Sequence, residues 1–87
     1  MEVNVLKSSK EEIEVELGNV TMAEILRVYL NKDSSVAFAA WRREHPSAKP
    51  VLKVKTKGKS VTKAISDAVS DIIKDLDKVE NDFKKLG

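Results

Sequence analysis

The last third of the chain carries an apolar repeat long enough for about seven turns of helix. Its members step by four and three positions without a break: Ile65, Val69, Ile72, Leu76, Val79, Phe83 and Leu86. A repeat of this period is typical of a helix that packs lengthwise against another element. We therefore expect one helix from Val61 to about Leu86.

The length of this helix limits how much of it the rest of the chain can cover. A helix of about 25 residues is ~38 Å long, whereas a strand of about seven residues spans only ~23 Å. The helix should therefore extend past its own sheet and leave Val79, Phe83 and Leu86 outside the core. An exposed apolar row of this kind usually marks a partner site.

Four segments before this helix have the alternation of β-strands. They are Glu2–Lys7, Ile13–Leu17, Val36–Glu44 and Val51–Lys57. In the third segment, alternation places Val36, Phe38 and Ala40 on one face and Ala37, Ala39 and Trp41 on the other. Because both faces are apolar, we expect a central strand, ended by a turn at His45 and Pro46.

A shorter helix is predicted between the second and third strands, in TMAEILRVYLN. Thr21 and Glu24 have the spacing of a capping box, so the helix should begin at Thr21. One stripe collects its large apolar residues, namely Met22, Ile25, Leu26, Tyr29 and Leu30. This stripe could extend the partner surface of the long helix.

The resulting order, ββαββα, predicts one α+β domain over residues 1–87. We expect two layers, with both helices on one face of a four-stranded antiparallel sheet. The hydrophobic fraction of 41% and the charged fraction of 34% are typical of a folded soluble chain. The chain has no cysteine and no apolar run of about 18 residues, so we expect a cytoplasmic protein outside the membrane.

No residue pattern indicates catalysis. His45, the only histidine, has no cysteine or second histidine to work with, and alternation would point the adjacent Glu44 the other way. The three glycines are isolated, which excludes a phosphate-binding loop. Asp71 and Asp75 alternate with lysines, as on any solvated helix. We expect no enzymatic activity of the chain alone, no metal and no cofactor.

Lysines along one strand face offer a second interpretation, a small nucleic-acid-binding domain. Lys53, Lys55 and Lys57 share a face and could follow a phosphate backbone. However, Glu12, Glu14 and Glu16 occupy the outer face of another strand of the same sheet and could pair with them if the two strands are neighbours. No aromatic residues are interleaved for base stacking, so we expect a solvated sheet face instead.

Four segments carry a resemblance to a known family: VNVLKS, TMAEILRVYL, VAFAAWRREHP and KTKG. They make the chain similar over its whole length to the archaeal RNA polymerase subunit L family, which is related to the bacterial alpha dimerisation domain. The matching motif residues are Thr21, Leu26, Arg27, Phe38, Trp41, His45 and Pro46. The chain departs at Val20 and Glu24, where the family usually has histidine and asparagine.

The resemblance implies a non-catalytic assembly subunit of DNA-directed RNA polymerase, a nucleotidyltransferase complex that carries out DNA-templated transcription. Such a chain would form a heterodimer with the larger alpha-like subunit of the polymerase, which is called D in archaea. The pair would form the platform for the two large catalytic subunits, which hold the active site and its magnesium. In isolation the chain could form a homodimer through the same face.

The resemblance also implies which residues meet the partner. The heterodimer core would comprise Met22, Ile25, Leu26 and Tyr29 of the first helix and Ile72, Leu76, Val79 and Phe83 of the second, with Leu86 at the end of the same seam. Phe38 and Trp41 would lie on the third strand. His45 and Pro46 would shape the turn that follows.

Overall fold

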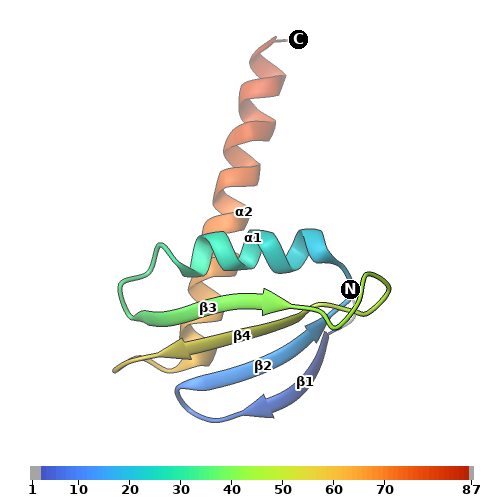
Figure 1. Ribbon diagram of the computed structural model, residues 1–87. Helices are drawn as coiled ribbons and strands as arrows, with labels where there is room; N and C mark the ends of the chain where they lie inside the picture. The colour runs from blue at the N-terminus through green and yellow to red at the C-terminus, as the bar shows by residue number, and fades with distance from the viewer. Residues whose placement is uncertain (1–2, 87) are drawn as a thin grey trace.

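The computed structural model describes residues 3–86, which form a four-stranded sheet and two helices (Figure 1). The elements are β1 (Val3–Ser8), β2 (Glu12–Leu17), α1 (Val20–Leu30), β3 (Val36–Arg42), β4 (Val51–Thr56) and α2 (Val61–Leu86). The expected α+β order ββαββα is confirmed. Glu2, expected at the start of the first strand, lies outside the described residues. None of the described helices is both long and apolar enough to span a membrane.

The strands follow the order β1-β2-β4-β3, and every neighbouring pair is antiparallel. β2 and β4 are therefore the central strands, and β3 lies at an edge. The expectation that β3 is central is wrong. The apolar residues on its outer face do not reflect burial on both sides, since Phe38 on that face is 46% exposed.

A β-bulge changes which side chains of β3 share a face. Val36 lies opposite Thr56, but Phe38 lies opposite Lys55 and Ala39 opposite Val54. One extra residue between Val36 and Phe38 interrupts the alternation, as bulges do. Val36 therefore packs against the core from the same side as Ala39 and Trp41, and the predicted grouping of Val36 with Phe38 is wrong.

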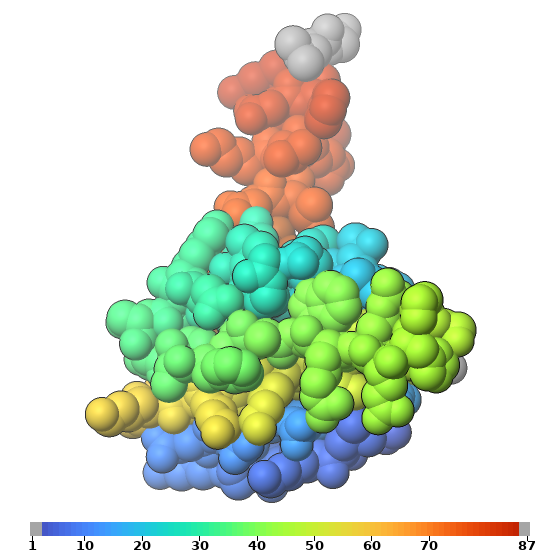
Figure 2. Space-filling view, viewed as in Figure 1, coloured from blue at the N-terminus to red at the C-terminus, as the bar shows by residue number. Residues whose placement is uncertain are grey.

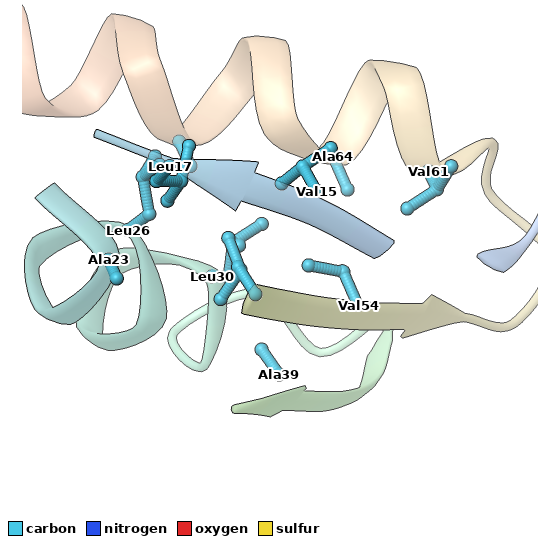
Figure 3. Close-up of a cluster of buried hydrophobic side chains, with 11 residues drawn as sticks. Val15, Leu17, Ala23, Leu26, Leu30, Ala39, Val54, Val61 and Ala64 are labelled. Carbon is cyan, nitrogen blue, oxygen red and sulfur yellow. The ribbon is translucent and has the colours of Figure 1, made fainter. Parts of the chain in front are cut away.

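The core fills the space between the inner face of the sheet and the two helices (Figure 3). Its largest fully buried side chains are Leu17, Leu30, Leu52, Val54 and Val61. Where the helices meet this core they contribute the small residues Ala23, Ala64 and Ala68, all buried. Small side chains at these positions let the backbones approach closely at the packing density of a protein interior.

The start of α1 differs from the predicted capping box. Asn19 is the N-cap, and its side-chain oxygen accepts a hydrogen bond from the Met22 N–H at 2.8 Å. The helix therefore begins at Val20, which puts Thr21 inside its first turn, where its side chain cannot act as the cap. The predicted capping box of Thr21 and Glu24 is therefore wrong, and Glu24 does not cap the helix.

α2 crosses the strands and continues well beyond them (Figures 1 and 2). Among residues 61–85, the buried ones are Val61, Ala64 and Ala68, and they all lie in the first eight of the helix's 26 residues. The C-terminal half stands clear of the other elements in the space-filling view (Figure 2). The expected overshoot of the sheet by this helix is confirmed.

Candidate functional site: an apolar surface on the long helix

The protruding half of α2 carries a row of exposed apolar side chains. Leu76 is 63% exposed, Val79 49% and Phe83 68%, and each belongs to the predicted seam. Ile73, which the seam does not include, is 53% exposed beside them. We call Ile73, Leu76, Val79 and Phe83 the α2 stripe. Large apolar groups that remain in water on a small domain indicate a surface that a partner covers.

The seam changes its environment along the helix. Ile65 and Ile72 pack against the domain's own core, whereas Val69 between them is 41% exposed. Leu86 ends α2, but its side chain lies outside what the structure describes. The side chains of the seam therefore pack on the domain's own core in the N-terminal half of α2 and are exposed to solvent in its C-terminal half.

An apolar groove adjoins the base of the stripe. It has a volume of about 300 Å³ and lies between β1, β2 and the first half of α2. Val3 and Val5 line its outer side, while Ile65 and Val69 line the side formed by α2. Val3 and Val5 are 52% and 54% exposed, because α2 crosses the strands and leaves β1 uncovered.

Sequence reasoning missed Val3 and Val5 as candidate surface residues. Their spacing, two apart in VNV, indicates that they share one face of their strand. The pairing of Val3 with Leu17 and of Val5 with Val15 puts this face on the same side of the sheet as the apolar residues of β2. That neither helix reaches this strand could not be read from the alternation.

The predicted interface residues of α1 are all at least half-buried within the domain. Leu26 is 7% exposed and belongs to the core, and Met22, Ile25 and Tyr29 are half-buried. The Tyr29 hydroxyl donates to Asp75 Oδ2 at 2.6 Å and so ties α1 to α2. This hydrogen bond to a carboxylate raises the pKa of Tyr29.

A cluster of ion pairs fixes the base of α2. The ammonium of Lys59 lies 2.7 Å from Asp33 Oδ2 and 2.6 Å from Asp67 Oδ2. These groups come from the turn before α2, the loop before β3 and α2 itself. Hydrogen bonds from Lys59 lower the pKa of both aspartates, with the Ser35 N–H adding to the effect at Asp33. The same bonds, to Asp33 and then Asp67, raise the pKa of Lys59.

Replacing Lys59 with methionine should lower the free energy of unfolding at pH 7. It should also make that free energy fall less as the solution becomes acidic. Because the pKa values of Asp33 and Asp67 lie below their ordinary 3.8 only in the folded chain, their stabilisation is present above that value. It is lost as the pH falls through the lowered values. The stabilisation from Lys59 has the opposite pH dependence. It is fully present below pH 10.5, the ordinary pKa of lysine, and is lost as the pH rises through the raised pKa of Lys59.

Urea unfolding at pH 7 and at about pH 2.5 measures this effect. The difference in free energy of unfolding between the wild type and Lys59→Met should be smaller at the acid pH, because protonation of the aspartates weakens their ion pairs with Lys59. Lys57→Met is the control: Lys57 is exposed and lies outside the cluster, so its replacement removes the same charge without breaking these ion pairs. Its free energy of unfolding should match that of the wild type at both pH values. If Lys59→Met lowers the free energy of unfolding equally at the two pH values, the assigned ion pairs are contradicted.

A polar cleft of about 500 Å³ lies beside this cluster, between the end of α1 and α2. Its charged lining residues are Lys32, Lys59, Lys74, Asp33, Asp67 and Asp71. The two signs are balanced, and Lys59 is committed to two aspartates. Nothing in the cleft selects an anionic or a cationic ligand, and residues 3–86 contain no group of acidic and histidine side chains that could hold a metal ion.

Glu24, one of the departures from the family motif, connects α1 to β3. It forms an ion pair with Arg27 and accepts a hydrogen bond from Trp41 Nε1 at 3.4 Å. Arg27 first, and Trp41 to a smaller degree, hold the pKa of Glu24 below its ordinary value. Trp41 is half-buried on the core side of the sheet. The motif residues Arg27 and Trp41 thus meet at one carboxylate.

The remaining motif residues have structural positions. Thr21 is exposed in the first turn of α1. His45 and Pro46 are exposed in the turn after β3, where His45 Nδ1 lies 2.8 Å from Ser47 Oγ and Arg43 donates to the Pro46 carbonyl at 3.1 Å. No carboxylate or second histidine accompanies His45 in these contacts.

The lysines of β4 face glutamates. β2 and β4 are neighbours, and their register puts Lys53 opposite Glu14 and Lys55 opposite Glu12. Lys53 and Lys7 each come within 3.6 Å of Glu12, while Arg42 reaches Glu14 at the same distance. Burial tends to raise the pKa of Glu12, but Lys7, Lys55 and Lys53 together lower it. Carboxylates thus offset much of the positive charge on this face.

Fold and surface together define a dimerisation domain: a small α+β core whose long helix holds apolar side chains out for a second chain. The chain belongs to the RNA polymerase Rpb3/Rpb11 dimerisation domain family, whose sequence model matches residues 10–82. It is also similar to the DNA-directed RNA polymerase subunit L of Thermoplasma acidophilum in its crystal structure. The two are 26% identical, with a TM-score of 0.84 over 97% of this chain and 86% of that chain.

These two findings confirm the resemblance to archaeal subunit L. No curated protein sequence matches the chain significantly.

Proposed function

We propose that this chain is the smaller partner in a heterodimer with the larger alpha-like subunit of RNA polymerase. The heterodimer would serve as the platform on which the large catalytic subunits assemble. In this role the chain acts in the cytoplasm and contributes no catalytic residue. The observation that carries the proposal is the α2 stripe, exposed on a helix that the domain cannot cover.

The groove beside β1 supports the same function. Val69 lines the groove and precedes the stripe by one turn, so the two form a continuous apolar surface. A partner that covers the stripe can therefore reach the groove as well. A continuous apolar surface is typical of permanent complexes, whose interfaces are more apolar than those of transient ones.

Mixing the purified chain with the larger alpha-like subunit tests the proposal. Size-exclusion chromatography with light scattering should show one species with the mass of a one-to-one complex at about 10 µM, well above the dissociation constant of a permanent interface. The corresponding alpha-like subunit of a distantly related polymerase gives a specificity control. Two separately eluting species at this concentration would contradict the proposed pairing.

The lysine strand gives no comparable support to a nucleic-acid-binding function. Lys53 and Lys55 lie opposite Glu14 and Glu12, and a paired lysine must break its ion pair before it can bind a phosphate. The apolar stripe, in contrast, has no such counterpart within the described residues.

A further inference from the structure

Carboxylates border the α2 stripe on both sides. Asp75 and Asp82 immediately precede Leu76 and Phe83 and lie seven residues apart, which places them along one edge. Glu80 immediately follows Val79 and lies along the other edge, in line with Ile73. All three carboxylates are exposed. A helix that packs on the stripe must therefore bring its own flanking residues close to negative charge.

The lysines of this half of α2 are placed differently. Lys74, Lys78 and Lys85 lie farther round the helix, away from the stripe, and none forms an ion pair with Asp75 or Asp82 in the structure. Lys84 contacts Glu80 at 3.3 Å, but both side chains are more than 60% exposed, so water weakens this pair. The borders of the stripe therefore keep most of their negative character.

A second copy of this chain would meet these borders unfavourably. In an antiparallel arrangement the Asp75 and Asp82 edges of the two helices would face each other. In a parallel arrangement Asp75 of one helix would approach Glu80 of the other. Like charges meet in both cases, so the apolar attraction between two stripes is opposed.

We propose that these acidic borders select the partner: they favour a helix whose apolar stripe is bordered by lysine or arginine, and they disfavour a second copy of this chain. The proposal rests on the proposed function, which assigns the stripe to a partner chain. It adds the charge of that partner's contact helix. Complementary charges across an interface commonly suppress wrong pairings in this way.

Self-association of the isolated chain provides the first test. Sedimentation equilibrium should show wild-type self-association becoming about fivefold tighter between about 0.05 M and about 0.5 M sodium chloride, because salt screens the repulsion. Asp75→Asn with Asp82→Asn should be about fivefold tighter than wild type at the lower salt concentration and should respond less to salt. Asparagine keeps an oxygen that can accept the Tyr29 hydroxyl hydrogen.

The matched control is Asp71→Asn with Asp77→Asn, which changes the net charge equally. Asp71 precedes the stripe along the helix, and Asp77 lies farther round it. This control should self-associate like the wild type. If it tightens as much as the test variant, net charge alone is responsible and the proposal is overturned. A test variant that remains as monomeric as wild type at the highest concentration also overturns it.

Charge reversal gives a second measurement. Asp75→Lys with Asp82→Lys should pair with the wild-type chain about tenfold more tightly than the wild type pairs with itself, because the introduced lysines meet Asp75 and Asp82 in an antiparallel pair and Glu80 in a parallel one. A mixed pair that is no tighter than the wild-type self-pair would overturn the proposal.

Titration against the larger alpha-like subunit separates this inference from the proposed function. No pairing with that subunit contradicts the proposed function. If the subunit binds but the affinity of the complex rises as salt is added, only the charge selection is contradicted. A partner helix with basic borders should bind more weakly as salt is added, because salt screens the attraction.

Discussion

Replacing both Val79 and Phe83 with aspartate is expected to weaken the complex with the larger alpha-like subunit by at least about a thousandfold. The two residues lie one turn apart at the C-terminal end of the α2 stripe, and Phe83 is its most exposed member. A few large side chains of this kind usually supply most of the binding energy of an interface. Each replacement removes an apolar contact and forces a carboxylate into a desolvated surface. Isothermal titration or light scattering of the mixed chains measures the loss.

The isolated variant should remain folded, because Val79 and Phe83 are 49% and 68% exposed and contribute little to the domain's own core. Ser70→Asp with Asn81→Asp is the matched control: it also converts two neutral residues of α2 to aspartate, at exposed positions on the opposite side of the helix. This control should bind nearly as well as the wild type. A stripe variant that pairs with wild-type affinity would show that the interface lies elsewhere.

Leu30→Ala is expected to lower the free energy of unfolding by about 3 kcal/mol. Leu30 ends α1 and has 0% of its surface exposed, between the helix and the sheet (Figure 3). Truncation removes its apolar contacts and leaves a cavity that the surrounding elements fill only in part. For a domain whose total stability is about 5–10 kcal/mol, Tm should fall by about 15 °C or more.

Val28→Ala provides the comparison on the same helix, because Val28 is 41% exposed. It should change the free energy of unfolding by less than about 0.5 kcal/mol. Urea denaturation of both variants at one fixed protein concentration measures the difference, since self-association would otherwise contribute to stability. A loss below about 1 kcal/mol for Leu30→Ala would show that the core is not packed as described.

The features that could be predicted from sequence share a local origin. The seam from Ile65 to Phe83 and the alternation in Ile13–Leu17 depend on residues close together in the chain. Comparing the length of a helix with that of a strand was enough to predict the overshoot of α2. The expectation that glutamates and lysines could pair was conditional on strand neighbours, and the register supplied that condition.

The errors arose where a distant part of the chain decides the outcome. The edge position of β3 follows from β4 pairing with β2 on its other side, and no residue of β3 records that pairing. The bulge near Val36 belongs to the ladder with β4 and not to the alternation of β3. At α1, Asn19 and Thr21 are both acceptable caps, and the backbone path after β2 selects Asn19.

The candidate surface divides along the same line. The sequence by itself determined that α2 is long, that one side of it is apolar and that acidic residues border that side, because helical period relates neighbours directly. Only the tertiary structure decided that Ile65 and Ile72 are covered while Leu76 is exposed, that Leu26 is buried and that Val3 and Val5 line a groove. The physical reason is that burial depends on where the sheet ends and how steeply α2 crosses it.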